Sequence, residues 1–111
     1  EQDYAKARKW FEKSAELEND EAMVHLGIFY RDGKGVEQDY AKARKWFEKS
    51  AELGNPDAMF FLGKLYQDGK GVEKDYQEAR KWLEKAAEVG NVEAMVHLGI
   101  FYRDGKGVEK D

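Results

Sequence analysis

The chain has 111 residues, a net charge of −4, one proline and no cysteine. The acidic balance supplies no basic field for a phosphate backbone, so nucleic acid is not an expected partner. The absence of cysteine excludes disulfides and thiolate metal sites, and the apolar residues never run long enough to span a bilayer, so we expect no membrane insertion.

The sequence repeats with a period of 36 residues and no insertion. The copies occupy residues 1–36, 37–72 and 73–108, and residues 109–111 open a fourth copy. A period of this length predicts a solenoid, in which each unit buries its apolar face against its neighbours. We expect a single repeat domain that is either a fragment or an engineered array, because the copies are closely alike and the chain starts within the segment that links them.

The first segment of each copy predicts an amphipathic helix. Over residues 4–17 the apolar side chains fall on one broad arc, while lysine, arginine and glutamate fill the other side. A glycine at the end, Gly54 or Gly90, can take the left-handed conformation without steric cost. Copy one has Glu18 there, which should destabilise the fold by about 1 kcal/mol if the backbone keeps the same geometry. We expect a frayed or locally different helix end at Glu18. The predicted N-caps are Asp3, Asp39 and Asp75.

A second helix follows almost at once in each copy. An asparagine is its predicted cap, and Pro56 stands at a first helical position, which a proline tolerates. Two helices joined by so short a turn must pack antiparallel. The caps are Asn19, Asn55 and Asn91, and the helices are expected to end near Arg31, Gln67 and Arg103.

Each copy closes with the same five residues, Asp32-Gly33-Lys34-Gly35-Val36 in copy one. The two glycines allow a sharp reversal of the chain, and the valine can anchor the loop on the core. The spacing matches neither of the glycine-rich phosphate-binding motifs, and no strand precedes it. We therefore interpret the segment as a structural turn between helices.

These residues together resemble the Sel-one-like repeat family, a relative of the tetratricopeptide repeats. The resemblance covers all three copies and implies an all-α, right-handed superhelical solenoid of αα-hairpins, with six helices in three repeats. It also implies a role in scaffolding or adapting protein complexes. The motif reads Ala22-x-x-x-Leu26-Gly27-x-x-Tyr30, then Asp32-Gly33-x-Gly35-Val36, then Asp39-Tyr40-x-Lys42-Ala43-x-x-Trp46-Phe47-x-Lys49-Ser50-Ala51-Glu52-x-Gly54-Asn55.

The second helix presents two faces with different roles. Ala22, Met23, Leu26, Gly27 and Tyr30 recur in every copy and share one face, which predicts packing. A glycine inside a helix costs about 1 kcal/mol relative to alanine, so Gly27 indicates that a neighbouring helix comes close.

The positions that point away from this face vary between copies and are the candidate binding site. If the implied superhelix holds, they line its concave surface, where apolar residues beside charges suit a peptide or a helix of a partner protein. The alternative is that they are more core, covered by the next unit. The predicted groove residues are Val24, Ile28, Arg31, Phe60, Lys64, Gln67, Val96, Ile100 and Arg103.

No catalytic, metal or cofactor site is expected. The two histidines, His25 and His97, lie two copies apart with no partner at ligand spacing. Ser14 and Ser50 fall in the apolar arc and are interpreted as small buried residues that bond back to their own helix. The tryptophans, which we expect in the core, are Trp10, Trp46 and Trp82.

The sequence thus favours a non-enzymatic scaffold or adaptor that binds a protein or peptide in a concave groove. Two alternatives remain open: a structural spacer, or a designed scaffold without a ligand. In either case the terminal helices expose faces that an adjacent unit would cover, which predicts head-to-tail self-association. The compartment is not indicated.

Overall fold

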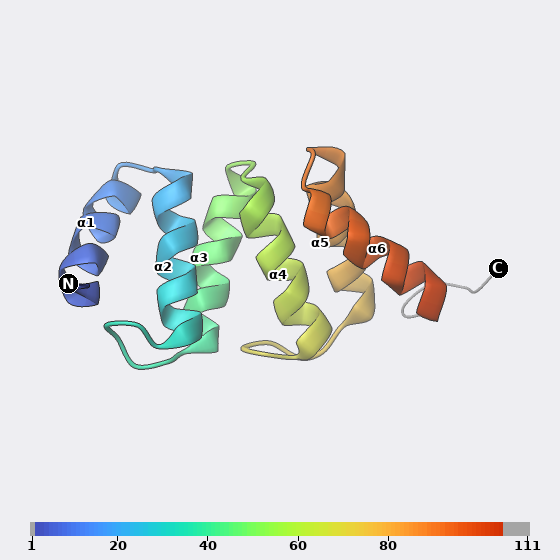
Figure 1. Cartoon of the computed structure of the whole chain (residues 1–111), viewed down its shortest axis with the longest axis horizontal. Coiled ribbons are helices and arrows are strands. Elements are labelled where there is room, and N and C mark those ends of the chain that lie inside the picture. The colour runs from blue at the N-terminus through green and yellow to red at the C-terminus, as the bar shows by residue number, and fades with distance from the viewer. Residues whose placement is uncertain (1, 106–111) are drawn as a thin grey trace.

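A computed structural model describes residues 2–105, which form six α-helices and no strand. Consecutive helices are antiparallel and stack into an elongated body of 50 × 25 × 24 Å, with the two ends of the chain at opposite ends of the stack (Figure 1). This is the all-α, superhelical solenoid that the repeat predicts. The helices are α1 (Tyr4–Glu16), α2 (Asp20–Asp32), α3 (Tyr40–Glu52), α4 (Pro56–Asp68), α5 (Tyr76–Glu88) and α6 (Val92–Asp104).

The predicted caps begin all six helices. Asp3 accepts a hydrogen bond from the Lys6 backbone N–H, and Asp39 and Asp75 do the same in their copies. The asparagine caps each accept from the backbone N–H three residues on, and Pro56 occupies the first turn of α4. The even-numbered helices run one residue further than expected and end at left-handed glycines, Gly33, Gly69 and Gly105.

The turn inside each hairpin contains a left-handed residue, so the expectation of a frayed or locally different end at Glu18 is wrong. Gly54 and Gly90 have φ of 95° and 94°, and Glu18 keeps the same kind of conformation with φ of 62°. Glu18 is the one residue other than glycine with positive φ among those described. Its Cβ is therefore held in a conformation that side chains disfavour.

Replacing Glu18 by glycine should stabilise the fold by about 1 kcal/mol, because it relieves this steric cost. Chemical denaturation of the Glu18→Gly chain measures the gain. The reverse change at an equivalent turn, Gly54→Glu, serves as the control and should destabilise by a similar amount. Unchanged stability in both variants would contradict the account.

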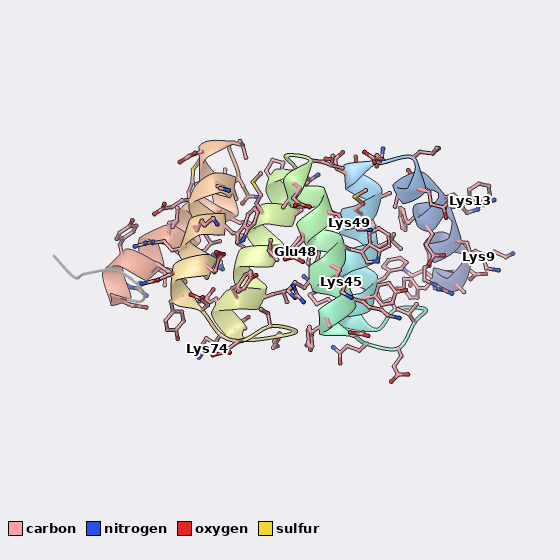
Figure 2. The ribbon with its side chains drawn as sticks, turned by 180° about the vertical axis from the view of Figure 1, so that it is seen from behind. Lys9, Lys13, Lys45, Glu48, Lys49 and Lys74 are labelled. Carbon is pink, nitrogen blue, oxygen red and sulfur yellow. The ribbon has the colours of Figure 1, made fainter. Side chains whose placement is uncertain are left out.

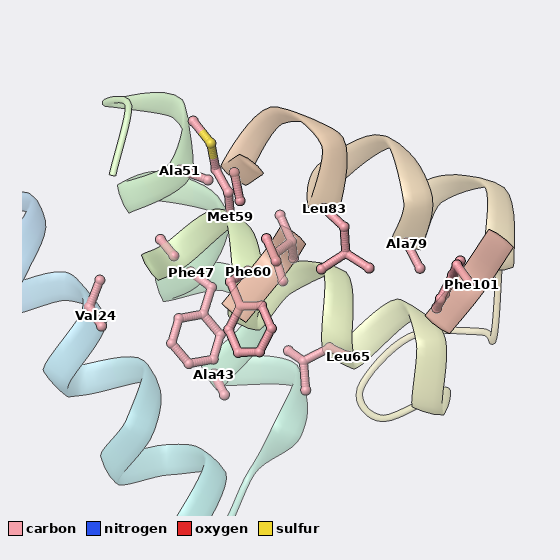
Figure 3. Packing of buried hydrophobic residues seen from close by; sticks show 14 residues of the cluster. Val24, Ala43, Phe47, Ala51, Met59, Phe60, Leu65, Ala79, Leu83 and Phe101 are labelled. Atoms are coloured by element: carbon pink, nitrogen blue, oxygen red, sulfur yellow. The ribbon is translucent and has the colours of Figure 1, made fainter. Parts of the chain in front are cut away.

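The core consists of a main cluster that runs from α2 to α6 (Figure 3) and a smaller one between α1 and α2. Helices approach closely at two glycines. A Cβ on Gly27 of α2 would overlap the fully buried Phe47 ring of α3. A Cβ on Gly63 of α4 would lie 3.0 Å from Leu83 Cγ of α5. The close approach inferred from Gly27 is thus confirmed.

Alanine at equivalent glycines should have opposite effects along the chain. Gly27→Ala should destabilise by about 1–3 kcal/mol, because the Phe47 ring is enclosed and must shift. Among the described residues nothing lies within 4 Å of a Cβ on Gly99, so Gly99→Ala should stabilise by up to about 1 kcal/mol through helix propensity. Thermal or urea unfolding of the two variants measures both. Equal effects would show that helix propensity, and not packing, governs these sites.

Successive hairpins are also tied by polar contacts between them. The Ser50 hydroxyl donates to the Asp20 backbone oxygen at 2.8 Å, and Asn55 Nδ2 donates to the Asp20 carboxylate at 2.8 Å. The expectation that Ser50 bonds back to its own helix is therefore wrong: it links α3 to the preceding α2. Asn91 makes the matching contact to Asp57 at 3.0 Å.

The loop that closes each of the first two copies packs on the first helix of the same copy. A Cβ on Gly35 would lie 2.8 Å from Tyr4 Cβ, which explains why this position is glycine, and Val72 packs against the core as an anchor. Most of the third loop and the start of the fourth copy, residues 106–111, lie outside the described residues. None of the described helices combines the length and apolar character needed to cross a membrane.

Candidate functional site

The structure buries two apolar residues of the predicted groove. Val24 is 6% exposed and Phe60 is 7% exposed, and both belong to the main core cluster. The Phe60 ring lies 5.5 Å from the Phe61 ring and 5.0 Å from the His97 ring of α6. The exposed placement expected for Val24 and Phe60 is therefore wrong, because the following helices cover them. Only their equivalent on the last helix, Val96, is open, with 56% exposure.

The remaining groove positions lie at the edge of this core. Ile28, Lys64 and Gln67 are half-buried, and so are Arg31 and Ile100, whereas Arg103 is exposed at the end of α6. The Gln67 amide oxygen is buried without a hydrogen-bond partner among the described residues. The predicted columns thus do not form a uniformly exposed groove: two members are buried, five are half-buried, and two at the last helix are exposed.

Three of the predicted residues are brought together at one pocket of about 300 Å³. Arg31, Phe60 and Lys64 line it, between the end of α2 and the outer side of α4. The loop after α2 completes the wall. The other lining residues are Asp32, Gln38, Tyr40, Phe61, Leu65, Asp68 and Lys70.

The pocket has an aromatic floor and a charged rim. The Arg31 guanidinium lies 5.1 Å from the centre of the Phe61 ring, and its Nε donates to the Asp32 carboxylate at 2.8 Å. This hydrogen bond holds the pKa of the Asp32 carboxyl below its ordinary value. Lys64 pairs with Asp68 at 3.9 Å. Gln38 Nε2 donates to the Arg31 backbone oxygen at 2.7 Å and fixes the loop to the helix end.

A second pocket, of about 610 Å³, lies on the face formed by α3 and α5 and was not expected from the sequence. Trp46 and Trp82 are half-buried and line it, while Trp10 is 70% exposed, so the expectation that all three tryptophans are core is wrong. The remaining lining residues are Tyr30, Lys42, Lys45, Glu48, Lys49 and Glu52, several of which Figure 2 shows on α3.

A lysine three residues after each tryptophan is the sequence signal for this face. Lys49 Nζ lies 5.1 Å from the Trp46 ring centre, and Lys85 Nζ lies 4.8 Å from that of Trp82. A cation over an aromatic ring shields it while leaving it on the surface. The tryptophan and lysine spacing could therefore have identified these rings as surface residues.

Both histidines pack against phenylalanine rings. Within residues 2–105 no group of three histidine, cysteine, aspartate or glutamate side chains could hold a metal ion. The His25 ring stacks on Phe11 with centroids 4.6 Å apart, and His97 meets Phe60 edge to face. Both histidines thus take part in aromatic packing.

Comparison with known families decides the identity of the repeat. The sequence model of the Sel1 repeat matches residues 1–19, 20–55, 56–91 and 92–111, which together span the whole chain. The chain belongs to the Sel1 repeat family. The family's complete units, 20–55 and 56–91, pair α2 with α3 and α4 with α5, and these pairs pack together more extensively than the helices within each hairpin.

Solved Sel1 repeat structures have the same architecture. A Sel1 repeat protein from Oxalobacter formigenes is 44% identical with a TM-score of 0.93, over 98% of this chain and 44% of that one. The protective antigen c5321 of uropathogenic Escherichia coli is 43% identical with a TM-score of 0.95, over 98% of this chain and 23% of that one. Cysteine-rich protein B of Helicobacter pylori is 34% identical with a TM-score of 0.78, over 82% of this chain and 68% of that one.

The chain spans less than half the length of the first two of these Sel1 repeat structures. A comparison with curated protein sequences returns no match. Sel1 repeat proteins are generally non-catalytic scaffolds for protein interactions.

Replacing Arg31 by glutamine, the residue at the equivalent position 67, should raise the pKa of Asp32 towards its ordinary value. A carboxyl pKa lowered by folding stabilises the fold above the unfolded pKa, and this stability is lost as the pH falls. The protonation of Asp32 at low pH should therefore cost the Arg31→Gln chain less stability than it costs the unmodified chain. NMR titration of the side-chain carboxyl carbons measures the shift. Arg103→Gln is the control, and an unchanged Asp32 titration in Arg31→Gln would contradict the assignment.

Proposed function

We propose that this Sel1 repeat chain binds a peptide or a helix of a partner protein at the pocket between α2 and α4. The observation that carries the proposal is the combination of an aromatic floor, Phe60 and Phe61, with a rim of basic side chains at Arg31, Lys64 and Lys70. Apolar pockets with a few convergent polar groups are typical recognition sites. The family's general role in protein interaction supports the same conclusion.

The chemistry of the rim favours a ligand with an apolar side chain next to a carboxylate. Arg31 is held by Asp32 and by the Phe61 ring, so its planar fork is oriented before a ligand arrives. An arginine in this state binds a carboxylate with less loss of side-chain freedom than a mobile lysine. The apolar neighbour of that carboxylate would contact the half-buried Phe61.

Peptide-library capture tests the proposal with a charge-reversed variant. Arg31→Glu with Lys64→Glu should weaken the binding of captured peptides by about tenfold or more, because it removes two of the three rim cations and repels a carboxylate. Phe60 is left unchanged because it is a core residue. Circular dichroism checks that the fold is intact.

The matched control reverses two exposed cations on the other face, Lys9→Glu with Lys45→Glu (Figure 2). It should keep the peptides. If this control loses them and the rim variant keeps them, the pocket at Trp46 and Trp82 is the binding site instead. If the unmodified chain retains no peptide, the chain acts as a spacer or a scaffold without a ligand.

Head-to-tail association of copies is a second candidate function. It is favoured by the apolar side chains that α6 leaves open, Val92, Met95 and Val96, and by the exposed Trp10 and Leu17 at the other end. An association of this kind joins two different surfaces and does not close into a ring of fixed size.

A further inference from the structure

The face that α6 leaves open is the one that α3 and α5 cover on the preceding even-numbered helices. Phe47 of α3 seats against Gly27 of α2, and Leu83 of α5 seats against Gly63 of α4. At the third equivalent position, Gly99, nothing among the described residues lies within 4 Å of the place a Cβ would take. The complementary surface for α6 is thus an odd-numbered helix that is absent from the described chain.

The chain itself carries a helix with that surface at its other end. The sequence of α1 is YAKARKWFEKSAE, identical to that of α3. The sequence of α6 is VEAMVHLGIFYRD, and α2 differs from it only by an aspartate in place of the first valine. The α1 of one copy and the α6 of another therefore hold every side chain of the internal α2–α3 contact except one.

The residues that α1 would use are incompletely covered in the described chain. Phe11 and Ser14 are half-buried, whereas their equivalents Phe47 and Ser50 are fully buried. Ala7 is half-buried, and its equivalent Ala43 is fully buried. Burial of this remaining apolar surface would favour association.

Charge and hydrogen bonding fit the same pairing. The helix α1 has four basic and two acidic side chains, while α6 has two acidic and one basic. The bond from Ser50 goes to a main-chain oxygen of residue 20, so Ser14 of a second copy could bond the oxygen of residue 92 whatever the side chain. At the α2–α3 contact Asn55 donates to the Asp20 carboxylate, which Val92 replaces on α6. The remaining carboxylate there is Glu93, the equivalent of the Asp57 that accepts from Asn91.

We propose that the occupant of the open α6 face is α1 of a second copy, in the register that α3 has on α2. This rests on the second candidate function and names its interface. Each junction leaves one α1 and one α6 free at the ends, so copies add in a line. The register places Phe11 of one copy against Gly99 of the other, and Asn19 of one beside Val92 of the other.

Sedimentation velocity of the 111-residue chain over a wide concentration range tests the proposal. One variant is expected to weaken self-association, and another is expected to tighten it. Gly99→Leu should weaken association by about tenfold or more, because its side chain fills the space for Phe11, while no described residue lies within 4 Å of its Cβ position. Val92→Asp should tighten association by about tenfold, because it restores the carboxylate for Asn19. A gain of this kind cannot arise from unfolding.

A mixing experiment tests the head-to-tail geometry. Ala7→Glu blocks α1 and Gly99→Leu blocks α6, so each chain alone should be monomeric and an equimolar mixture should give a 1:1 dimer and nothing larger. Circular dichroism confirms that both variants are folded, and Ala7→Lys replaces Ala7→Glu if the latter is not. An unmodified chain that stays monomeric, association that survives Gly99→Leu, or a mixture that stays monomeric would overturn the proposal.

These outcomes are distinct from those of peptide capture. Arg31 and Lys64 are unchanged in the Gly99→Leu chain, so its monomer should still retain the peptides that the pocket binds. Failure of self-association therefore leaves the groove proposal standing, and failure of peptide capture leaves the interface standing.

Discussion

The close seating of a large side chain against a helix glycine is the contact on which the solenoid depends. The Phe47 ring occupies the place that any side chain at position 27 would need, so α2 and α3 approach more closely than two ordinary helices can. The same arrangement recurs between Gly63 and Leu83. Because packed interiors tolerate little change in volume, this spacing fixes the separation and register of successive units.

Tight stacking also decides which residues remain available for recognition. It encloses Val24 and Phe60, which a looser superhelix would present to a ligand. The solvent-facing part of the α2–α4 surface is reduced to a pocket with cations at its edge. Selectivity would then come mainly from the charged rim, while the buried rings set the depth of the pocket.

The sequence predicted the local structure well because local rules determine it. The 36-residue period, the aspartate and asparagine caps and the glycine turns all follow from single residues or short spacings. Glu18 is the exception, because it keeps the turn conformation of Gly54 where a different helix end was expected. Burial was harder to predict. Val24 and Phe60 face away from the packing surface that recurs in every copy of the helix. Only the placement of later helices shows that they are covered.

The tryptophans and Ser50 illustrate the same limit. A tryptophan on an apolar arc predicts burial, but Trp10 lies on the first helix of the stack and is exposed, and Trp46 lies on a face shared with lysines. The hydroxyl of Ser50 has two possible acceptors, one in its own helix and one in the neighbouring unit. Sequence spacing indicates only the first, whereas the observed bond goes to the second.

Each copy contains one tryptophan, so intrinsic fluorescence can report on the unfolding of each copy. In a linear array, stability is a sum of unit terms and nearest-neighbour terms, so a helix with one neighbour opens at lower free energy than a helix with two. Trp10 belongs to such an end helix, and Trp46 and Trp82 belong to interior ones. Emission from variants that each keep a single tryptophan would therefore separate fraying at the first unit from loss of the central stack.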